Sequence, residues 1–259
     1  AMQVRTDEAR QIRLFSHGTT LHGVQSLDPA KRLIPGSYYH PGSPIAHVAR
    51  ALQAERPGGV HMGILGMGTA ATACLARAQD KVTFYEIDPA VIEIAKNPEH
   101  FTYWRDCPPQ KTVVVGDARL SISQTPDETY DMILMDAFSS DAIPVHLLTI
   151  QALNRFRAKL RKDGVMVYHI SNRYLNLKPV VGGLAKAAGW EAYVSEKSFG
   201  KALQPMVSTS SVVAIAPPGA FPDALRRHQD WKPLDIPADA PLWTDDFTNI
   251  LSVIGRTSS

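Results

Sequence analysis

The chain has 259 residues, of which 44% are hydrophobic and 20% charged, so it can bury a substantial core. Lys and Arg exceed Asp and Glu by 27 − 25 = 2, and no long basic run occurs, so neither a nucleic-acid partner nor a membrane-surface partner is indicated. No apolar run reaches the roughly 18 residues of a membrane-spanning helix. Ala1 and Met2 are treated as an appended tail and left out of the fold prediction.

The two cysteines, Cys74 and Cys107, lie far apart and lack the spacing of metal ligands. The sequence therefore predicts neither a disulfide framework nor a zinc site. We expect buried thiols in a reducing compartment, a cytoplasmic location and no bound metal.

The first predicted element is a small β-hairpin. Residues 11–27 contain two strand-like runs on either side of His17-Gly18, a dipeptide that suits a turn. A loop rich in Pro and Gly, SYYHPGSP, follows, and apolar residues then recur at helical spacing over residues 45–55. We expect an N-terminal β element and loop over residues 1–42, followed by one larger domain over residues 43–259.

Seven short apolar runs follow, most of them separated by segments of helical length. Strands that alternate with helices predict βαβ units and an α/β fold with a mostly parallel sheet, because both faces of each strand are covered. The runs are VHMGIL (60–65), KVTFYEI (81–87), KTVVV (111–115), YDMILM (130–135), GVMVYHI (164–170), EAYVS (191–195) and SSVVAIA (210–216).

A glycine-rich turn lies between the first of these strands and an Ala-rich segment predicted to be helical. Gly66 and Gly68 permit a tight turn and let a ligand approach the backbone. Such a turn is sometimes purely structural, and it also suits a dinucleotide. The fingerprint of nicotinamide-binding proteins, however, is G-x-G-x-x-G. Here Gly68 is followed by Thr-Ala-Ala, so the small Ala71 stands where the third glycine of that fingerprint would be.

Acidic residues end the next strands. Glu86 ends the second strand, where a carboxylate can accept hydrogen bonds from two ribose hydroxyls. Asp117 and Ala118 follow the third, where an acid can accept a hydrogen bond from an adenine amino group. Because ligands bind at this edge of open α/β sheets, the set predicts a nucleoside site.

The glycine turn, "YEID", "GDAR" and "YDMILMD", in this order, resemble the Rossmann-like class I adenosylmethionine-dependent fold, and specifically the spermidine synthase (polyamine aminopropyltransferase) family. The resemblance covers about residues 20–200 and implies that residues 43–259 are the nucleoside-binding catalytic domain. It implies Glu86 as the ribose ligand and Asp117 with Ala118 as adenine contacts. It also places Gln25 at a donor-contacting glutamine.

Two aspartates at the end of the fourth strand carry the predicted chemistry. The resemblance implies that Asp136 lies beside the donor and acts on the attacking amine, while Asp141 lies two residues beyond the expected amine-holding acid. A protonated amine is no nucleophile, so a carboxylate that accepts its proton is needed. Both aspartates could instead cap a helix that begins near Pro144.

The sequence departs from the family in its other acids. Thr69 stands where an aspartate of the glycine turn is usual, and no glutamate follows Tyr38, Tyr39 and His40. Fewer carboxylates repel the carboxylate of intact S-adenosylmethionine less than the usual set would. This favours intact S-adenosylmethionine as the donor over decarboxylated S-adenosylmethionine, the other donor that the resemblance allows, and the acceptor is a small amine such as putrescine.

Two further segments, HGTTLHGVQ and PLWTDDFTNILSVI, resemble spermidine-synthase-like domains fused to membrane-spanning segments in bacteria, which implies a soluble part of a larger membrane protein. Asp245 and Asp246 would close over the amine or form a solvated turn. Tyr39 and His40 would line the pocket or cover the sheet edge. We interpret His169 as a structural core residue.

Three functions follow from the sequence. The first is an aminopropyltransferase that releases methylthioadenosine, with Asp136 as base. The second is other adenosylmethionine chemistry on the same scaffold, either a lyase or cyclase reaction or methyl transfer. The third is a non-catalytic adenosylmethionine sensor. Family relatives often dimerise through their N-terminal strands, so the resemblance also allows a homodimer.

Overall fold

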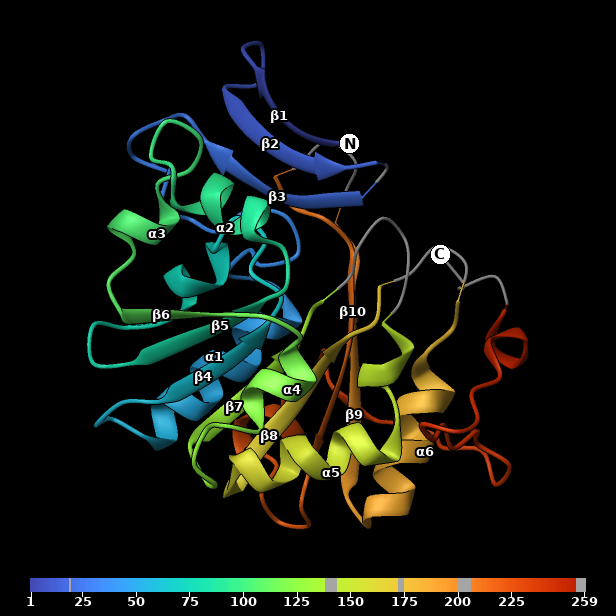
Figure 1. Cartoon of the computed structure of the whole chain (residues 1–259). Helices are drawn as coiled ribbons and strands as arrows, with labels where there is room; N and C mark the ends of the chain where they lie inside the picture. The colour runs from blue at the N-terminus through green and yellow to red at the C-terminus, as the bar shows by residue number, and fades with distance from the viewer. Residues whose placement is uncertain (19, 138–143, 172–174, 200–205, 255–259) are drawn as a thin grey trace.

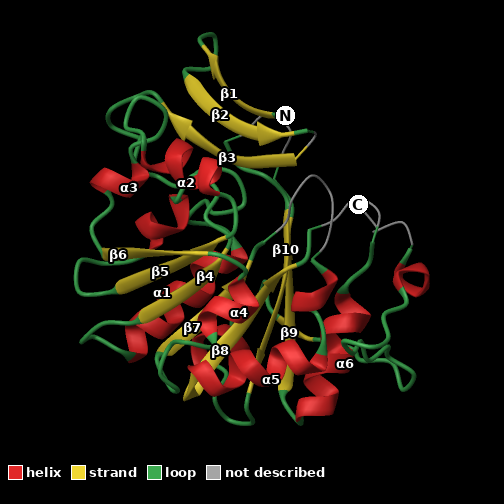
Figure 2. Cartoon of the chain, in the orientation of Figure 1, coloured by secondary structure: helices red, strands yellow, loops and turns green. Residues whose placement is uncertain are grey.

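The computed structural model describes residues 1–18, 20–137, 144–171, 175–199 and 206–254. Their strands form a three-stranded sheet and an eight-stranded sheet. Figure 1 shows the small sheet lying across one end of the large one, and Figure 2 shows helices on either side of the large sheet.

The strands of the small sheet are β1 (Met2–Asp7), β2 (Ile12–His17) and β3 (Thr20–Ser26). Those of the large sheet are β4 (His61–Leu65), β5 (Lys81–Glu86), β6 (Gln110–Val115), β7 (Tyr130–Met135), β8 (Leu160–His169), β9 (Glu191–Lys197), β10 (Ser210–Ala216) and β11 (Lys232–Pro233). The α-helices are α1 (Pro44–Glu55), α2 (Pro89–Lys96), α3 (Tyr103–Asp106), α4 (Ala118–Ile122), α5 (Ile150–Lys159), α6 (Lys178–Ala188) and α7 (Asp223–Arg226). Short 3-10 helices are η1 (Ala71–Leu75), η2 (Val145–Leu147) and η4 (Ile250–Val253).

The large sheet has the order β11-β9-β10-β8-β7-β4-β5-β6. Its neighbours from β8 through β7, β4 and β5 to β6 are parallel, and β10 runs antiparallel between β8 and β9. Parallel strands bring their carboxyl ends to one edge, which is where ligands bind in this class of fold. The predicted α/β class with a mostly parallel sheet is confirmed.

The large sheet separates two apolar cores, because alternate residues of each strand face opposite sides. Met132 and Leu134 of β7 pack with α1, η1, α2, α3 and α7 on one side. Ile133 and Met135 of the same strand pack with α4, α5 and α6 on the other. All six residues of β7 are buried, which explains why the strand is apolar apart from Asp131.

The start of the chain corrects the prediction. The expected hairpin exists as β2 and β3, but β1 pairs with β2 along its length, from Met2 opposite His17 to Asp7 opposite Ile12. Leaving Met2 out as part of a tail was therefore wrong. Phe15 of β2 is fully buried in the core that includes α1, so the small sheet packs onto the large unit. The division at residue 42 stays a prediction.

The segment after the glycine turn also differs from expectation. It forms only the short 3-10 helix η1, which ends at Leu75 because Ala76 adopts an extended conformation with φ of −96° and ψ of 150°. Ala70, in a left-handed conformation with φ of 64°, keeps the helix from starting earlier.

Cys74 and Cys107 form a disulfide, with their Cα atoms 4.9 Å apart and a sequence separation of 33 residues. It joins η1 to the residue that follows α3. The expectation of two buried free thiols was wrong, because the contact between η1 and α3 depends on tertiary packing that cysteine spacing does not reveal. Since disulfides persist in oxidising compartments, the basis for expecting a reducing one is removed.

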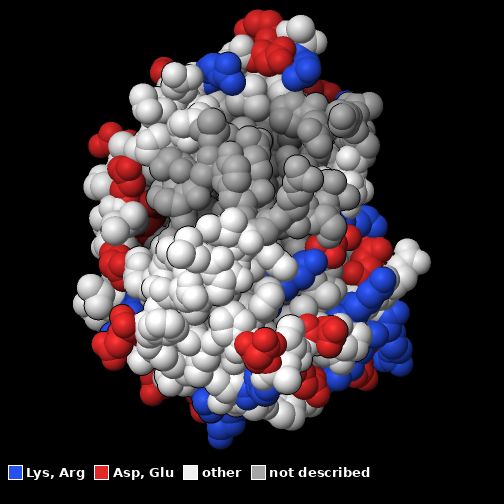
Figure 3. All heavy atoms as spheres, turned by 90° about the vertical axis from the view of Figure 1, so that its right-hand side faces the viewer, with Lys and Arg blue, Asp and Glu red and all other residues white. Residues whose placement is uncertain are grey.

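The surface carries both signs of charge. Figure 3 shows Lys and Arg interspersed with Asp and Glu over the lower part of one face, as expected from a net charge of +2. Among the described helices, none is both long enough and apolar enough to cross a membrane.

Candidate active site

A cavity of about 420 Å³ lies where the carboxyl ends of β4, β5, β6 and β7 approach β2 and β3. This volume falls within the usual range for small-molecule sites. Seven of the predicted site residues line it: Tyr39, Gly66, Gly68, Glu86, Asp117, Ala118 and Asp136.

The glycine turn brings β4 against the end of β7. Gly66 has φ of +98°, and a Cβ atom there would lie 2.5 Å from the backbone oxygen of Asp136. Gly68 has φ of +51°, and its Cβ would lie 2.7 Å from the backbone oxygen of His22. Side chains at either position would clash with backbone and strain the conformation, so both glycines are required by close approach.

Glu86 connects this turn to the turn after β5. Its Oε2 accepts a hydrogen bond from the Met67 amide at 2.9 Å, and its Oε1 accepts one from the Asp88 amide at 3.0 Å. Burial raises the pKa of Glu86, while these amide donors oppose the rise by stabilising the charged form. The carboxylate is thereby fixed in position, and each oxygen keeps a second lone pair that can accept a ligand hydroxyl.

Asp117 caps α4, since its Oδ1 accepts the Leu120 amide at 3.0 Å. Its Oδ2 lies 3.0 Å from Nε2 of His146, a cavity residue that was not predicted. Ile87, whose side chain is 67% exposed, also lines the cavity. Its exposed apolar side chain, in the same cavity lining as Glu86 and Asp117, offers a surface on which a flat aromatic ring could lie.

Asp136 lies at the deep end of the cavity, with only 3% of its side chain exposed. The Tyr39 hydroxyl donates a hydrogen bond to Oδ2, and His169 Nδ1 lies 2.7 Å from Oδ1. An ionised carboxylate can only accept hydrogen bonds, so Nδ1 of His169 carries a proton and donates it. Among the described residues, each oxygen of Asp136 thus has one partner of this kind.

His169 contacts Asp136, although the sequence analysis interpreted it as a structural core residue. The register of β7 and β8 pairs Met135 with Tyr168, so Asp136, just after β7, and His169, the last residue of β8, lie side by side. His169 Nε2 lies 2.8 Å from the hydroxyl oxygen of Ser171, and the Tyr38 ring lies 4.3 Å from the imidazole between centroids. The predicted burial of His169 is correct, but its partner is the proposed base.

Burial favours the neutral form of two other ionisable groups near Asp136, His22 and Tyr38. Burial lowers the pKa of His22, against the opposing effect of the Asp136 charge. Burial, together with Asp136, raises the pKa of Tyr38. Neutral rings around one carboxylate leave its charge available to a cationic ligand.

Three predicted residues do not line the cavity. The Gln25 amide donates to the Arg32 carbonyl and to Thr102 Oγ1 and accepts from the Thr102 amide, so it joins loops instead. Thr69 is fully buried, with its side chain packed against Gly23. His40 accepts a hydrogen bond from the Gly42 amide on Nδ1.

The late acids are also outside the cavity. Asp245 accepts two hydrogen bonds from Arg119, at 2.8 and 2.5 Å, and one from the Thr149 hydroxyl at 2.8 Å. Hydrogen bonding to Arg119 lowers the pKa of Asp245 to about 2. Asp246 is exposed and does not line the cavity. Asp141 lies outside the described residues.

No family model matches the chain. Among curated proteins, 85 residues are 40% identical to the polyamine aminopropyltransferase of Vibrio vulnificus (strain CMCP6), covering 32% of this chain and 27% of that one. Over 154 residues the chain is 29% identical to a probable polyamine aminopropyl transferase of Bifidobacterium longum (strain NCC 2705), covering 58% and 31%. A match of 33% over 106 residues to an N-terminal histidine N-methyltransferase of Emericella nidulans covers 39% and 18%. The matches thus span less than a third of each relative's length.

Among solved structures, the chain resembles a probable spermidine synthase from Corynebacterium glutamicum ATCC 13032, with a TM-score of 0.69 and 14% identity. The alignment covers 95% of this chain and 94% of that one. A spermidine synthase from Thermotoga maritima aligns with a TM-score of 0.51 and 14% identity over 98% and 84%. These likenesses confirm the Rossmann-like fold with its small N-terminal sheet.

Proposed function

We propose that this spermidine-synthase-like chain transfers an aminopropyl-type group from a sulfonium nucleoside to a small amine, releasing methylthioadenosine, with Asp136 as the base. The donor is S-adenosylmethionine or its decarboxylated form, and putrescine represents the class of acceptor. The aminopropyltransferase names of two relatives support the general reaction.

The observation that carries the proposal is the position of Asp136 within the cavity. Glu86, Asp117 and Ala118 lie at one part of the cavity lining, where they would bind ribose and adenine. Asp136 follows β7, which lies on the other side of β4 from β5, and it faces the same cavity from beside Tyr39 and His169. A donor held by its nucleoside would therefore present its sulfonium group near this carboxylate, which stabilises positive charge.

In the proposed step, the ammonium group of the acceptor donates a proton to Asp136 and becomes a nucleophile. The amine nitrogen then attacks the propyl carbon bonded to sulfur. A C–N bond forms and the C–S bond breaks, with its electron pair returning to sulfur. The products are neutral methylthioadenosine and an alkylated ammonium ion, and Asp136 returns its proton to solvent as the products leave.

Tyr39 and His169 would position the base. Each donates one hydrogen bond to a different oxygen of Asp136, so the carboxylate plane is fixed before substrate binds. A fixed orientation lowers the entropy cost of reaching the reactive geometry. His169 is in turn oriented by Ser171, whose oxygen also accepts the Ser211 amide at 2.8 Å.

The donor remains the main chemical question. Asp245 is paired with Arg119, and Thr69 is buried, so neither supplies a carboxylate to the cavity. A site with few acids repels the carboxylate of intact S-adenosylmethionine less than a site with many. If the chain uses the decarboxylated form, that form should bind at least about tenfold more tightly in calorimetry, equivalent to about 1.4 kcal/mol.

The decisive experiment is mass spectrometry of the protein incubated with each donor, with and without putrescine. Methylthioadenosine and an alkylated amine formed together, only when both substrates are present, support aminopropyl-type transfer. Methylthioadenosine without an acceptor would indicate a lyase or cyclase. No nucleoside product in any mixture, despite donor binding, would indicate a sensor and overturn the proposal.

Methyl transfer is the second candidate, and the methyltransferase among the relatives favours it over a lyase or cyclase reaction. Its nucleoside product would be adenosylhomocysteine instead of methylthioadenosine. The same spectra therefore distinguish the two reactions, because the two nucleosides differ in mass.

A further inference from the structure

A second group of chemically active side chains lies away from the cavity. His47 belongs to α1, while His228 and Asp230 lie between α7 and β11. One donor atom from each residue lies within 4.8 Å of those of the other two. None of the three lines the cavity, so this cluster takes no part in the proposed reaction.

We infer that His47, His228 and Asp230 form a binding site for a transition-metal ion of the zinc type. Two imidazoles and a carboxylate are a donor set that Zn²⁺ uses, with water completing four-coordination. Ligand atoms in such a site are about 3.3 Å apart, given bonds of about 2.0–2.1 Å. The three donor atoms here lie within 4.8 Å of one another. To reach the zinc geometry they would move closer together by about 1.5 Å, which side-chain rotation can supply.

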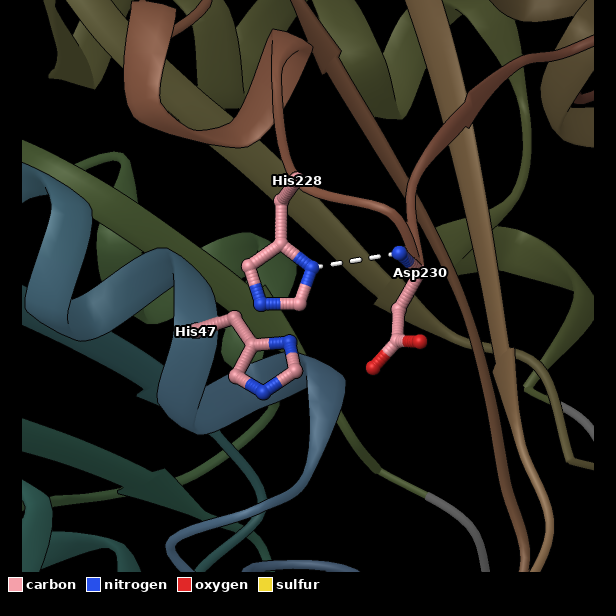
Figure 4. Close-up of side chains that lie close together, drawn as sticks. All are labelled: His47, His228 and Asp230. Carbon is pink, nitrogen blue, oxygen red and sulfur yellow. Dashed lines mark hydrogen bonds between the residues drawn. The ribbon is translucent and has the colours of Figure 1, made fainter.

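The orientation of the rings supports the assignment. Figure 4 shows the two imidazoles one above the other, each with a ring nitrogen on the side that faces Asp230. Their centroids are 4.3 Å apart. His228 Nδ1 accepts a hydrogen bond from the Asp230 amide at 3.1 Å, so its lone pair already points toward Asp230. A metal would take over that lone pair.

His47 supplies the independent observation. Its side chain is about nine-tenths buried, and its Nδ1 has no hydrogen-bond partner among the described residues. An orphaned buried nitrogen costs free energy unless something pairs with it.

The surrounding charges select the kind of metal. Lys197 Nζ lies 2.6 Å from Asp230 Oδ2, so Asp230 would bind a metal through Oδ1 while Lys197 orients the carboxylate. Arg50 adds a second positive charge nearby. A hard cation held by charge alone would be repelled here, whereas Zn²⁺ gains from nitrogen ligation. Mg²⁺ and Ca²⁺ should not bind.

A bound metal would connect α1 to the segment between α7 and β11. Helix α1 begins at Pro44, shortly after Tyr39, whose hydroxyl donates to Asp136. A metal at this site would therefore stabilise the position of α1, the helix that follows Tyr39, from outside the cavity.

The test is Zn²⁺ binding by the untagged full chain, measured by competition with a chromophoric zinc indicator. We expect one ion per chain in the wild type and at least about tenfold weaker binding in His228→Ala and Asp230→Asn. His228 is half-buried, so its replacement should not disturb the core as replacement of His47 could. His100→Ala, which removes an imidazole far from the cluster in sequence, is the matched control and should bind as the wild type does.

A second readout separates binding at this site from adventitious binding. Zn²⁺ should raise the melting temperature of the wild type and of His100→Ala but not that of His228→Ala. Equal affinity and equal thermal shifts in all variants would overturn the inference, as would Mg²⁺ or Ca²⁺ binding as tightly as Zn²⁺. Neither result bears on the nucleoside products, so this inference and the proposed function fail or stand separately.

Discussion

Two buried aspartates lie at opposite ends of strand β7 and differ in how their charges are compensated. Asp131, at the start, lies 3.0 Å from Arg56 Nε and 3.4 Å from Arg161 Nε, and it accepts the His61 amide at 2.7 Å. Asp136, after the end, is held by a tyrosine and a histidine and faces a cavity. Arginines, which keep their charge, make the first a structural group, whereas no Lys or Arg among the described residues pairs with the second, so it stays able to accept a proton.

The largest expected effect is on stability, at the structural end of β7. Asp131→Ala removes a buried carboxylate that pairs with Arg56 and Arg161 and accepts the His61 amide, and it should lower the free energy of unfolding by about 3 kcal/mol. Urea denaturation measures this change. Asp163→Ala is the matched control, because Asp163 contacts the same arginine but is 67% exposed, and it should cost less than about 1 kcal/mol. Equal losses for the two variants would contradict the distinction.

The next effect is on catalysis, at the other end of the strand. Asp136→Asn keeps the shape of the side chain but cannot accept a proton, so turnover should fall by about two or more orders of magnitude. Methylthioadenosine binding, measured by calorimetry, should persist because Glu86 and Asp117 are unchanged. Near-normal turnover would remove Asp136 from the mechanism. Asp127→Asn, at an exposed carboxylate, serves as the control.

A smaller effect is expected from a residue that positions the base. Tyr39→Phe removes one of the two protein donors to Asp136 and should lower kcat about tenfold, as the loss of one hydrogen bond to a charged group would. Tyr103→Phe is the control, since its buried hydroxyl donates to the Val24 carbonyl at 2.9 Å and does not line the cavity. That variant should lose stability but keep its kcat. Similar kcat losses in both would refute a positioning role.

The smallest effect concerns an acid that the sequence assigned to the amine. Asp245→Asn should leave the KM for the amine unchanged and cost under about 1 kcal/mol of stability, because the pair with Arg119 is partly exposed. The folded-state pKa of Asp245 is lowered to about 2, so this contribution is present above the unfolded-state value near 3.8 and is lost as pH falls toward 2. Denaturation curves at several pH values test this. A several-fold rise in the KM for the amine would show that Asp245 does take part in binding the amine.

What could be predicted from the sequence was local. The apolar run of β7, the glycines of the turn and the acids that end strands all follow from periodicity and position, and they were found. The strand β1 was missed because none of its six residues is buried, so its sequence, MQVRTD, contains no apolar run.

The missed features depend on contacts between distant segments. Gln25 was assigned to the donor, but its amide is occupied by Thr102, 77 residues away. His169 could be recognised only once β7 and β8 were known to be neighbours in register. Such pairings follow from how the elements pack, which residue types alone do not reveal.

The disulfide between Cys74 and Cys107 closes a covalent ring, and Glu86 lies inside it together with β5 and α2. The proposed ribose ligand is therefore carried on a segment anchored at both ends by one chemical bond. Reducing that bond frees the segment in the unfolded chain, which favours unfolding of the unit that would hold the nucleoside. The redox state of the buffer thus becomes an experimental variable for nucleoside affinity, alongside pH and salt.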